Sequence, residues 1–224
     1  ITMKAVILAA GSGKRMRPLT LDTPKPLLKI GDKTFLDHIF SALPPEIDEV
    51  VLVVGYLGEK IRAYCGSNFH GRKVHYAEGS SRGNAYSFLA AKPFFSSGEK
   101  LVVLYGDELV LKEELDRTLE HPYAWLCYEV EDPTKSGIVT IKDGKVVEVV
   151  EKPKSPKSKL AAVGLMVADE RLFHYTPYPN DSGEYYITSL MNQFVKEAAV
   201  VAVIGIMNRP QFTTPEDIPK LEKM

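Results

Sequence analysis

A glycine-rich turn followed by clustered positive charge lies near the start of the chain, in AAGSGKRMRPLTLDTPKPLL (Ala9–Leu28). Gly11 and Gly13 have no Cβ, so the backbone there can approach a ligand closely and offer its N–H groups. Lys14 and Arg15 follow directly and supply positive charge. Backbone N–H groups and cations are the groups that hold phosphate, so the stretch predicts a site for a phosphorylated ligand.

The spacing of the glycines excludes two common phosphate loops. A Walker loop requires Gly, four residues and then Gly-Lys-Ser/Thr. Here Leu8 occupies the first glycine position and Arg15 the Ser/Thr position. A dinucleotide fingerprint requires a third glycine where this chain has Met16. The loop therefore belongs to another kind of phosphate site.

Over its whole length the stretch resembles the signature of the sugar-phosphate nucleotidylyltransferases, the NDP-sugar pyrophosphorylases. The chain shares with that signature Gly11, Gly13, Arg15, Pro18, Leu19, Thr20, Pro24, Lys25, Pro26 and Leu27. The resemblance implies transfer of a nucleotidyl group from a nucleoside triphosphate (NTP) to a sugar 1-phosphate, with release of pyrophosphate. It also implies a nucleotide-binding loop made of Ala10, Gly11, Ser12, Gly13 and Lys14.

Three charged residues carry the catalytic roles that the resemblance implies. Arg15 contacts the leaving β- and γ-phosphates, and Lys25 bridges the α-phosphate and the attacking phosphate. Asp107, in the segment LYGDE, binds Mg²⁺, a hard ion that prefers oxygen ligands. Two of these residues also have a purely structural interpretation, since Lys25 can be a surface charge and Asp107 can cap a following helix.

Further segments extend the resemblance along most of the chain. EGSSRGNAYS matches the family's base-contacting segment, which implies nucleotide binding by Glu78 and Gly83. The sugar-phosphate contacts that the resemblance implies are Gly137, Glu151, Lys152, Gly164 and Glu184. Several of these residues also have a purely structural interpretation. Glu78 can form a surface ion pair with Arg82 or Lys73, and Lys152 can be a solvated loop charge. Gly137 and Gly164 can simply be tight positions in the sheet.

The second metal ligand departs from the family pattern, in which many members have an aspartate near the C-terminal end of the match. Two registers of NRPQFTTPED are possible. One puts Gln211 at that position. The other, similar to the uridylyltransferases for N-acetylglucosamine 1-phosphate, puts Asn208 there, and we favour it. Either ligand is uncharged, so Asp107 would contribute most of the affinity for Mg²⁺.

Substrate identity stays open at the level of the sequence. GEYYIT and NRPQF resemble the uridylyltransferase pattern and favour UTP as the donor. Asn84 replaces the family's threonine, and Glu108 follows Asp107 where a neutral residue is frequent, so base and sugar recognition can differ. The alternatives are a cytidylyltransferase acting on phosphocholine or inositol phosphate, and a non-catalytic nucleotide-sensing domain on the same fold. Because little sequence follows the match, we expect no acetyltransferase region and no acyl transfer.

The implied chemistry needs positioning and charge neutralisation rather than a general base. A phosphate monoester has a second pKa of about 6, so the attacking phosphate oxygen is already ionised at neutral pH. The two substrates together bring roughly six negative charges, which repel one another steeply at short range. Fixed cations and main-chain N–H groups can hold such phosphates in line.

The elements that must position these residues alternate between strand and helix in the first half of the chain. Apolar β-branched runs predict strands at 4–10, 48–55, 73–79 and 99–108, with helical patterns between them at 35–43, 58–65 and 82–95. Parallel strands covered by helices on both faces follow from this alternation. Ligands of such sheets bind at the carboxyl ends of the strands, where both the Gly11 turn and Asp107 lie.

From Tyr123 onward strands predominate, at 123–130, 137–152 and 159–169, with Asp143-Gly144 as a hairpin turn. A helix at 184–198 and a strand at 200–206 follow. We expect an α/β fold with a mixed, mostly parallel sheet and an added antiparallel section, which the resemblance makes a Rossmann-like three-layer nucleotidyltransferase fold. One domain would span 1–224, with a nucleotide-binding part at about 1–110 and a sugar-binding part at about 111–224.

Composition fits a soluble globular protein, with 45% hydrophobic and 25% charged residues. The net charge of −1 gives no global attraction to nucleic acid or to anionic lipid, so we expect neither as a partner. No apolar run reaches the length of a membrane span, and the first apolar run is typical of a buried strand rather than a signal peptide. Two cysteines, Cys65 and Cys127, favour a reduced, cytoplasmic protein, with homo-oligomer formation left open.

Overall fold

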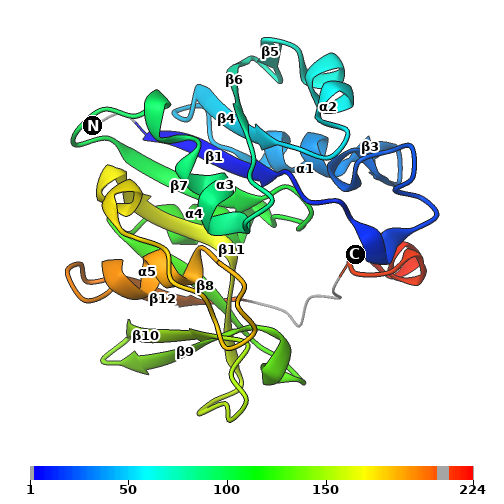
Figure 1. Cartoon of the computed structure of the whole chain (residues 1–224). Helices are drawn as coiled ribbons and strands as arrows, with labels where there is room; N and C mark the ends of the chain where they lie inside the picture. Colours follow the sequence, from blue (N-terminus) through cyan, green and yellow to red (C-terminus); the bar gives the residue numbers. More distant parts are fainter. Residues whose placement is uncertain (1–2, 206–211, 224) are drawn as a thin grey trace.

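The computed structural model describes residues 3–205 and 212–223, and a mixed ten-stranded sheet runs through these residues (Figure 1). The strand order is β5-β6-β4-β1-β7-β11-β8-β12-β10-β9. The strands are β1 (Met3–Ala9), β4 (Glu49–Val54), β5 (Asn68–Phe69), β6 (Arg72–Glu78), β7 (Lys100–Tyr105), β8 (Ala124–Glu129), β9 (Gly137–Lys142), β10 (Lys145–Glu151), β11 (Leu160–Asp169) and β12 (Val201–Ile204). A small separate sheet pairs β2 (Lys29–Ile30) with β3 (Lys33–Thr34).

Four strands of the first half lie parallel, as the alternating pattern predicts. β1 is central, with β4 on one side and β7 on the other, and β6 continues beyond β4. In the register, Leu8 of β1 is opposite Val53 of β4 and Tyr105 of β7. The carboxyl ends of these strands therefore share one edge of the sheet, and the loops that leave them meet there.

The second half adds the expected antiparallel section. β11 pairs antiparallel with both β7 and β8, and it also contacts the start of β9. β9 and β10 form the predicted hairpin, with both turn residues in the left-handed region, Asp143 at φ 50° and Gly144 at φ 74°. One continuous sheet thus joins the proposed nucleotide-binding and sugar-binding parts.

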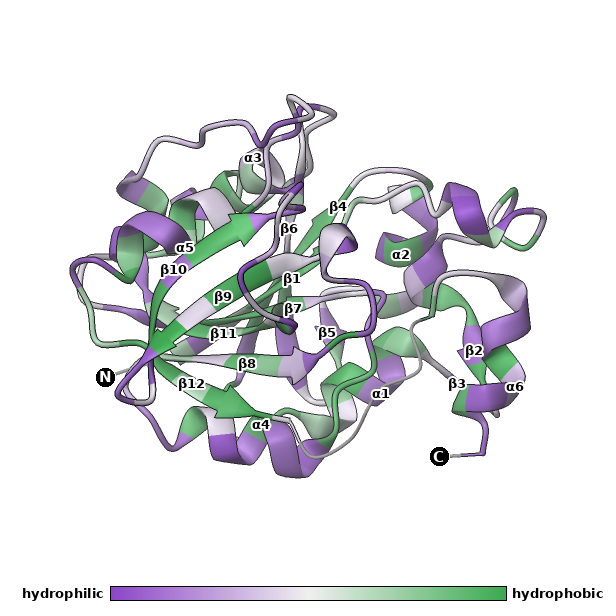
Figure 2. Cartoon of the chain, turned by 90° about the horizontal axis from the view of Figure 1, so that it is seen from below, coloured by the Kyte–Doolittle hydropathy of each residue, from purple (hydrophilic) through white to green (hydrophobic). Residues whose placement is uncertain are grey.

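Helices cover both faces of the sheet, which confirms the expected layers. They are α1 (Phe35–Ala42), α2 (Gly58–Cys65), α3 (Asn84–Leu89), α4 (Lys112–Leu119), α5 (Thr188–Phe194) and α6 (Ile218–Leu221). Along β1, Ala5 and Ile7 join the core cluster that includes α1, whereas Val6 faces the cluster that includes α3 and α5. Figure 2 shows apolar strands inside and polar helix faces outside.

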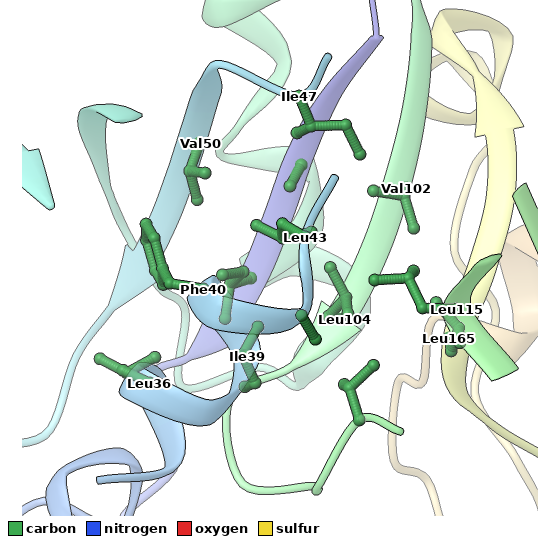
Figure 3. Packing of buried hydrophobic residues seen from close by; sticks show 14 of the residues in the cluster. Leu36, Ile39, Phe40, Leu43, Ile47, Val50, Val102, Leu104, Leu115 and Leu165 are labelled. Carbon is green, nitrogen blue, oxygen red and sulfur yellow. The ribbon is translucent and has the colours of Figure 1, made fainter. Parts of the chain in front are cut away.

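The helix α1 shows how local sequence fixes an element. Thr34 caps it, accepting a hydrogen bond from Asp37 N while the Asp37 carboxylate accepts one from Thr34 N. Its apolar residues recur at helical spacing, so Leu36, Ile39 and Phe40 all point into the core. Figure 3 shows these side chains against the strands of the first half. Their burial anchors the loop that precedes the helix.

A third, smaller cluster lies apart from the main cores and joins the two ends of the described chain. It comprises Met16, Leu28, Ile30, Phe35, Phe212 and Leu221. The first four belong to the segment that carries the glycine-rich turn and the residues after it. The last two belong to the C-terminal segment 212–223, which ends beside that turn in Figure 1.

One helix prediction was wrong at its start, and one helix was missed. The helix predicted from residue 184 begins only at Thr188, because residues 184–187 form a loop across the sheet edge. The sequence pattern missed α4, whose eight residues are mostly polar and whose only buried apolar side chain is Leu115. Within the described residues, no helix has the length and apolar character needed to cross a membrane.

Candidate active site

The loops that follow the parallel strands meet around Ala10, at the end of β1, and they meet through glycines. A Cβ on Gly55, after β4, would lie 2.8 Å from Ala10 O, and one on Gly79, after β6, would lie 2.4 Å from Ala10 Cβ. Gly106, after β7, donates its N–H to Leu8 O at 2.9 Å. Close backbone approach gathers these loops into one bare main-chain surface.

The glycine-rich turn is folded back on the residues that follow it. Gly13 has φ 57°, and a Cβ there would lie 3.0 Å from Thr20 Cγ2 and 3.2 Å from Lys25 Cβ. Thr20 Oγ1 donates a hydrogen bond to Gly13 O at 2.7 Å. Gly11, in contrast, is exposed and faces open space. The turn therefore needs glycine at residue 13 for its own packing and leaves residue 11 free to approach a ligand.

Lys25 and Asp107 lie together at this edge, although 82 residues separate them in the chain. The Lys25 ammonium donates to the Asp107 carboxylate at 2.8 Å, and the side chains are 11% and 41% exposed. Lys25 lies between Pro24 and the buried Pro26 and begins the short 3₁₀ helix Lys25–Leu27. The next helix starts at residue 112 with residue 111 as its N-cap, so Asp107 is an ion-pair partner rather than a cap.

Arg15 lies on the 3₁₀ helix Lys14–Met16, two residues beyond Gly13, and is exposed to solvent. Its neighbour Met16 is buried and anchors the turn in the small apolar cluster. Among the residues that the structure describes, the Arg15 guanidinium makes no hydrogen bond and no ion pair. It is therefore available to an anionic ligand bound at the turn.

The base-contacting segment is split between two environments. Glu78, at the end of β6, is 75% exposed and pairs with Arg62 of α2, rather than with Arg82 or Lys73. Gly83 has φ 130°, and a Cβ there would lie 2.2 Å from Tyr185 O. The structure thus places Glu78 at the outer rim and presses Gly83 against the loop that carries Glu184.

A cavity of about 180 Å³ lies between β10, α5 and residues 178–186, and two of the predicted sugar-phosphate contacts, Glu151 and Glu184, line it. Glu151 lines it and accepts a hydrogen bond from Thr188 Oγ1 at 2.9 Å. Gly137 packs against this pair, since a Cβ there would lie 2.9 Å from Glu151 Oε2. Burial raises the pKa of Glu151, and the bond from Thr188 and the charge of Lys152 only partly offset it.

Lys152, whose backbone is strained with φ 47°, contacts two residues that line this cavity. Its ammonium donates to Glu184 Oε2 at 3.2 Å and also to the Tyr186 hydroxyl. Burial lowers the pKa of Lys152, but the bonds with Tyr186 and Glu184 outweigh that effect and raise it overall. An ammonium has three donors, so one remains for a phosphate oxygen.

Gly164, on β11, joins the two parts of the site. A Cβ there would lie 2.3 Å from Cγ of the partly buried Tyr105 ring, so the strand can lie over Tyr105 only with glycine. Gly164 N also donates to Glu108 Oε2 at 3.1 Å. Sheet packing alone therefore explains this glycine, while it also positions β11 between Asp107 and the cavity.

Sequence reasoning missed residues that connect these groups. Asn84 accepts a hydrogen bond from Ile187 N at 2.7 Å and donates to the Tyr105 hydroxyl at 3.4 Å. It thereby ties the base-contacting segment to the cavity loop, and its departure from the family's threonine was the available signal. Tyr186 and Thr188 lie in the GEYYIT segment, but their pairing with Lys152 and Glu151 is seen only in three dimensions.

The second metal ligand lies outside the described residues in both registers, since neither Asn208 nor Gln211 is among them. Across residues 3–205 and 212–223, no three His, Cys, Asp or Glu side chains gather to hold a metal. The half-exposed Asp107 carboxylate, beside a bare main-chain surface, fits a divalent cation that takes its other oxygens from phosphate and water.

Comparison with known proteins decides the family. The model of the family described as Nucleotidyl transferase matches residues 4–207. The chain belongs to this family. The nucleotidyl transferase is 31% identical over 204 residues to the bifunctional protein GlmU of Methanocaldococcus jannaschii, a match that covers 90% of this chain and 49% of GlmU. The chain thus spans about half the length of that relative.

A second relative matches over its whole length. The UTP–glucose-1-phosphate uridylyltransferase AglF of Haloferax volcanii is 30% identical over 237 residues, covering 99% of this chain and 96% of AglF. A solved putative glucose-1-phosphate thymidylyltransferase from Bacillus anthracis has a TM-score of 0.83 at 24% identity and covers 99% of the nucleotidyl transferase and 94% of its own chain. A UDP-glucose pyrophosphorylase complexed with UDP-glucose has a TM-score of 0.83 at 19% identity, covering 100% and 98%. These structures confirm the predicted fold class.

Proposed function

We propose that this nucleotidyl transferase moves a nucleotidyl group from an NTP, with UTP preferred, to a sugar 1-phosphate and releases pyrophosphate. The Lys25–Asp107 ion pair beside the bare turn 11–13 is the observation that carries the proposal. It puts a cation and an oxygen ligand at one edge of the sheet, where phosphates would bind. The names of AglF and of the two structural neighbours support a sugar 1-phosphate as the acceptor, and that of AglF supports UTP.

The nucleotide side of the site would neutralise the triphosphate. Main-chain N–H groups of residues 10–14 would hold its oxygens, and the exposed Arg15 would contact the leaving phosphates. Lys25 would face the α-phosphate and the incoming phosphate. Asp107 would hold Mg²⁺ together with phosphate oxygens, and the bound ion supplies further charge neutralisation.

The acceptor side would position a nucleophile that needs no deprotonation. Lys152 would use its third donor for the sugar phosphate, and its raised pKa keeps it cationic at neutral pH. Glu151 and Glu184, which line the cavity, would accept hydrogen bonds from sugar hydroxyls. Attack by the phosphate oxygen on the α-phosphorus, in line with the leaving pyrophosphate, then follows from position.

The test is pyrophosphate release by the purified protein with Mg²⁺. UTP, dTTP, CTP and GTP would each be combined with glucose 1-phosphate, N-acetylglucosamine 1-phosphate, phosphocholine and inositol phosphate. The proposal expects turnover with a sugar 1-phosphate and most efficiently with UTP. Turnover restricted to CTP with phosphocholine or inositol phosphate would instead show a cytidylyltransferase.

A nucleotide-sensing domain gives a different result in the same experiment. It would bind NTP, measured by calorimetry, and release no pyrophosphate with any pair. Absence of both binding and turnover would overturn the proposal together with the site.

A further inference from the structure

The C-terminal segment contributes an aromatic ring to the Lys25 environment, apart from the residues of the proposed site. The Lys25 ammonium lies 5.3 Å from the centroid of the Phe212 ring, within the range of a cation–π interaction. The same ammonium donates to Asp107 at 2.8 Å. Because the Lys25 side chain is only 11% exposed, water competes little for the ammonium, and the attraction of the ring is strengthened.

The ring is itself held firmly. Phe212 is 7% exposed, and its centroid lies 4.4 Å from that of Phe35, with an angle of 46° between the planes. Phe35 begins α1 and is fully buried. Met16, which follows the glycine-rich turn in the chain, belongs to the same apolar cluster as Phe35 and Phe212. The ring is thus fixed to the segments that carry both the turn and Lys25.

The ring and the carboxylate hold Lys25 in different ways. Asp107 is exposed enough to be shared with another cation, and in the proposed function it has to be. A cation at Asp107 takes up part of the negative charge on which Lys25 depends. The ring of Phe212 carries no net charge and cannot be neutralised, so its hold on the ammonium persists when Asp107 is engaged.

We propose that Phe212 is a positioning residue that keeps the Lys25 ammonium at the phosphate-facing edge while Asp107 is shared. This proposal rests on the proposed function. It assigns the C-terminal segment a part in the reaction that packing alone does not require. The alternative is that Phe212 only fills the small apolar cluster, as Phe35 does.

A fluorination series separates the two interpretations, because fluorine weakens the negative face of the ring and barely changes its size. Phe212 would be replaced in turn by mono-, di- and trifluorophenylalanine, and the same series at Phe35 serves as the matched control. Phe35 shares the cluster, and no cation lies over its ring among the described residues. At residue 212, kcat is expected to fall stepwise by roughly 3- to 30-fold in total, with KM for NTP changed less. At residue 35, kcat is expected to change by less than about 2-fold.

A second measurement does not depend on turnover. Competitive acetylation followed by mass spectrometry gives the reactivity of Lys25 relative to the exposed Lys112. Weakening the ring destabilises the charged ammonium, so acetylation of Lys25 is expected to speed up along the 212 series and stay constant along the 35 series. Phe212→Leu should match the trifluoro variant, and Phe212→Tyr should match the unaltered protein.

The outcomes are distinguishable from failure of the proposed function. A protein without pyrophosphate release still reports the acetylation trend, which tests the hold on Lys25 alone. A flat acetylation series at residue 212, or equal slopes at residues 212 and 35, overturns the proposal. A graded acetylation series with unchanged kcat overturns the role in the reaction and leaves only the contact.

Discussion

The ion pairs Lys25–Asp107 and Lys112–Asp116 have the same 2.8 Å separation but different surroundings. Lys25 and Asp107 are 11% and 41% exposed, whereas Lys112 and Asp116, on the surface of α4, are 63% and 46% exposed. An exposed pair of this kind contributes little. The Lys25–Asp107 pair instead lies beside the glycine-rich turn. We therefore expect it to matter for ligand binding rather than for stability.

At the scale of single residues, the first prediction concerns removal of the Lys25 charge. Lys25→Met is expected to lower kcat by about 10²- to 10³-fold, the usual effect of losing one group that stabilises transition-state charge. Lys112→Met is the matched control and should change kcat by less than about 2-fold. Initial rates of pyrophosphate release measure both. Equal effects of the two substitutions would contradict the assignment of Lys25.

Asp107 should determine the requirement for the metal. Asp107→Asn keeps the shape of the side chain and removes its charge, so the Mg²⁺ concentration for half-maximal rate is expected to rise about 10-fold or more. Asp116→Asn on α4 controls for loss of a carboxylate paired with lysine. Titration of the rate with Mg²⁺ after treatment with a chelator gives both values. An unchanged midpoint would remove Asp107 from the metal site.

The partly buried Glu151 predicts a pH dependence of stability. Burial raises its pKa above the ordinary value of 4.5, so the native state binds this proton more tightly than the unfolded state. The resulting stability is present below about pH 4.5 and is lost as pH rises through the native pKa. The free energy of unfolding, relative to Glu151→Gln, should therefore fall across that range in urea titrations. Glu148→Gln, on the same strand but exposed, is the control and should run parallel to the unaltered protein.

At the scale of elements, the packing of β11 on β7 positions both halves of the site. The strand touches Tyr105 through Gly164 and continues to Ala162, which pairs with Gly137 of β9. Its other side pairs with β8. A change at this crossing is therefore felt at the phosphate edge and at the cavity together.

Gly164→Ala tests that crossing. The new Cβ would lie 2.3 Å from Tyr105 Cγ, and such overpacking costs about 1–3 kcal/mol of unfolding free energy. In a Tyr105→Ala background Cγ and the ring are absent, so the same change should cost less by about 0.5–3 kcal/mol. Urea unfolding of the four proteins gives the coupling energy. Strict additivity would show that the ring does not dictate glycine here.

At the scale of the whole molecule, the proposed function has nucleotide and acceptor held by different parts of one sheet. The net charge of −1 offers no general attraction for anionic substrates, so local cations would have to recruit each of them. In this proposal Arg15 and Lys25 would serve the first half, and Lys152 would serve the second. The base-contacting segment docks on the cavity loop through Gly83 and Asn84, so the halves are distinct in charge and joined in structure.

Separate recognition predicts a selective change in KM. Lys152→Met is expected to raise KM for the sugar 1-phosphate by about 10-fold, the loss of one charge-assisted hydrogen bond, with KM for the NTP changed by less than about 3-fold. Lys157→Met, whose lysine pairs with Glu148 on the surface, is the control. Steady-state rates with each substrate varied in turn provide the values. A parallel rise in both constants would contradict the division of the site.

The sequence predicted the strands of the first half well, because their apolar runs are long and their ends carry the glycines and Asp107. It failed where an element is mostly polar, as in α4, and where a loop replaces the first turn of a helix, as before Thr188. Contacts between distant segments could not be derived from it. Neither the bond of Asn84 to Ile187 nor the place of Phe212 over Lys25 follows from periodicity, since both depend on how the loops cross.

The small apolar cluster has a consequence for folding during synthesis on the ribosome. Met16 and Phe35 emerge early in synthesis, whereas Phe212 and Leu221, which cover them, are translated near the far end of the described chain. Until then, these apolar side chains stay exposed next to the turn. Exposed apolar surface of this kind is recognised by chaperones. A chain truncated before residue 212 would therefore keep the strands of the sheet but leave Met16 and Phe35 uncovered beside the glycine-rich turn.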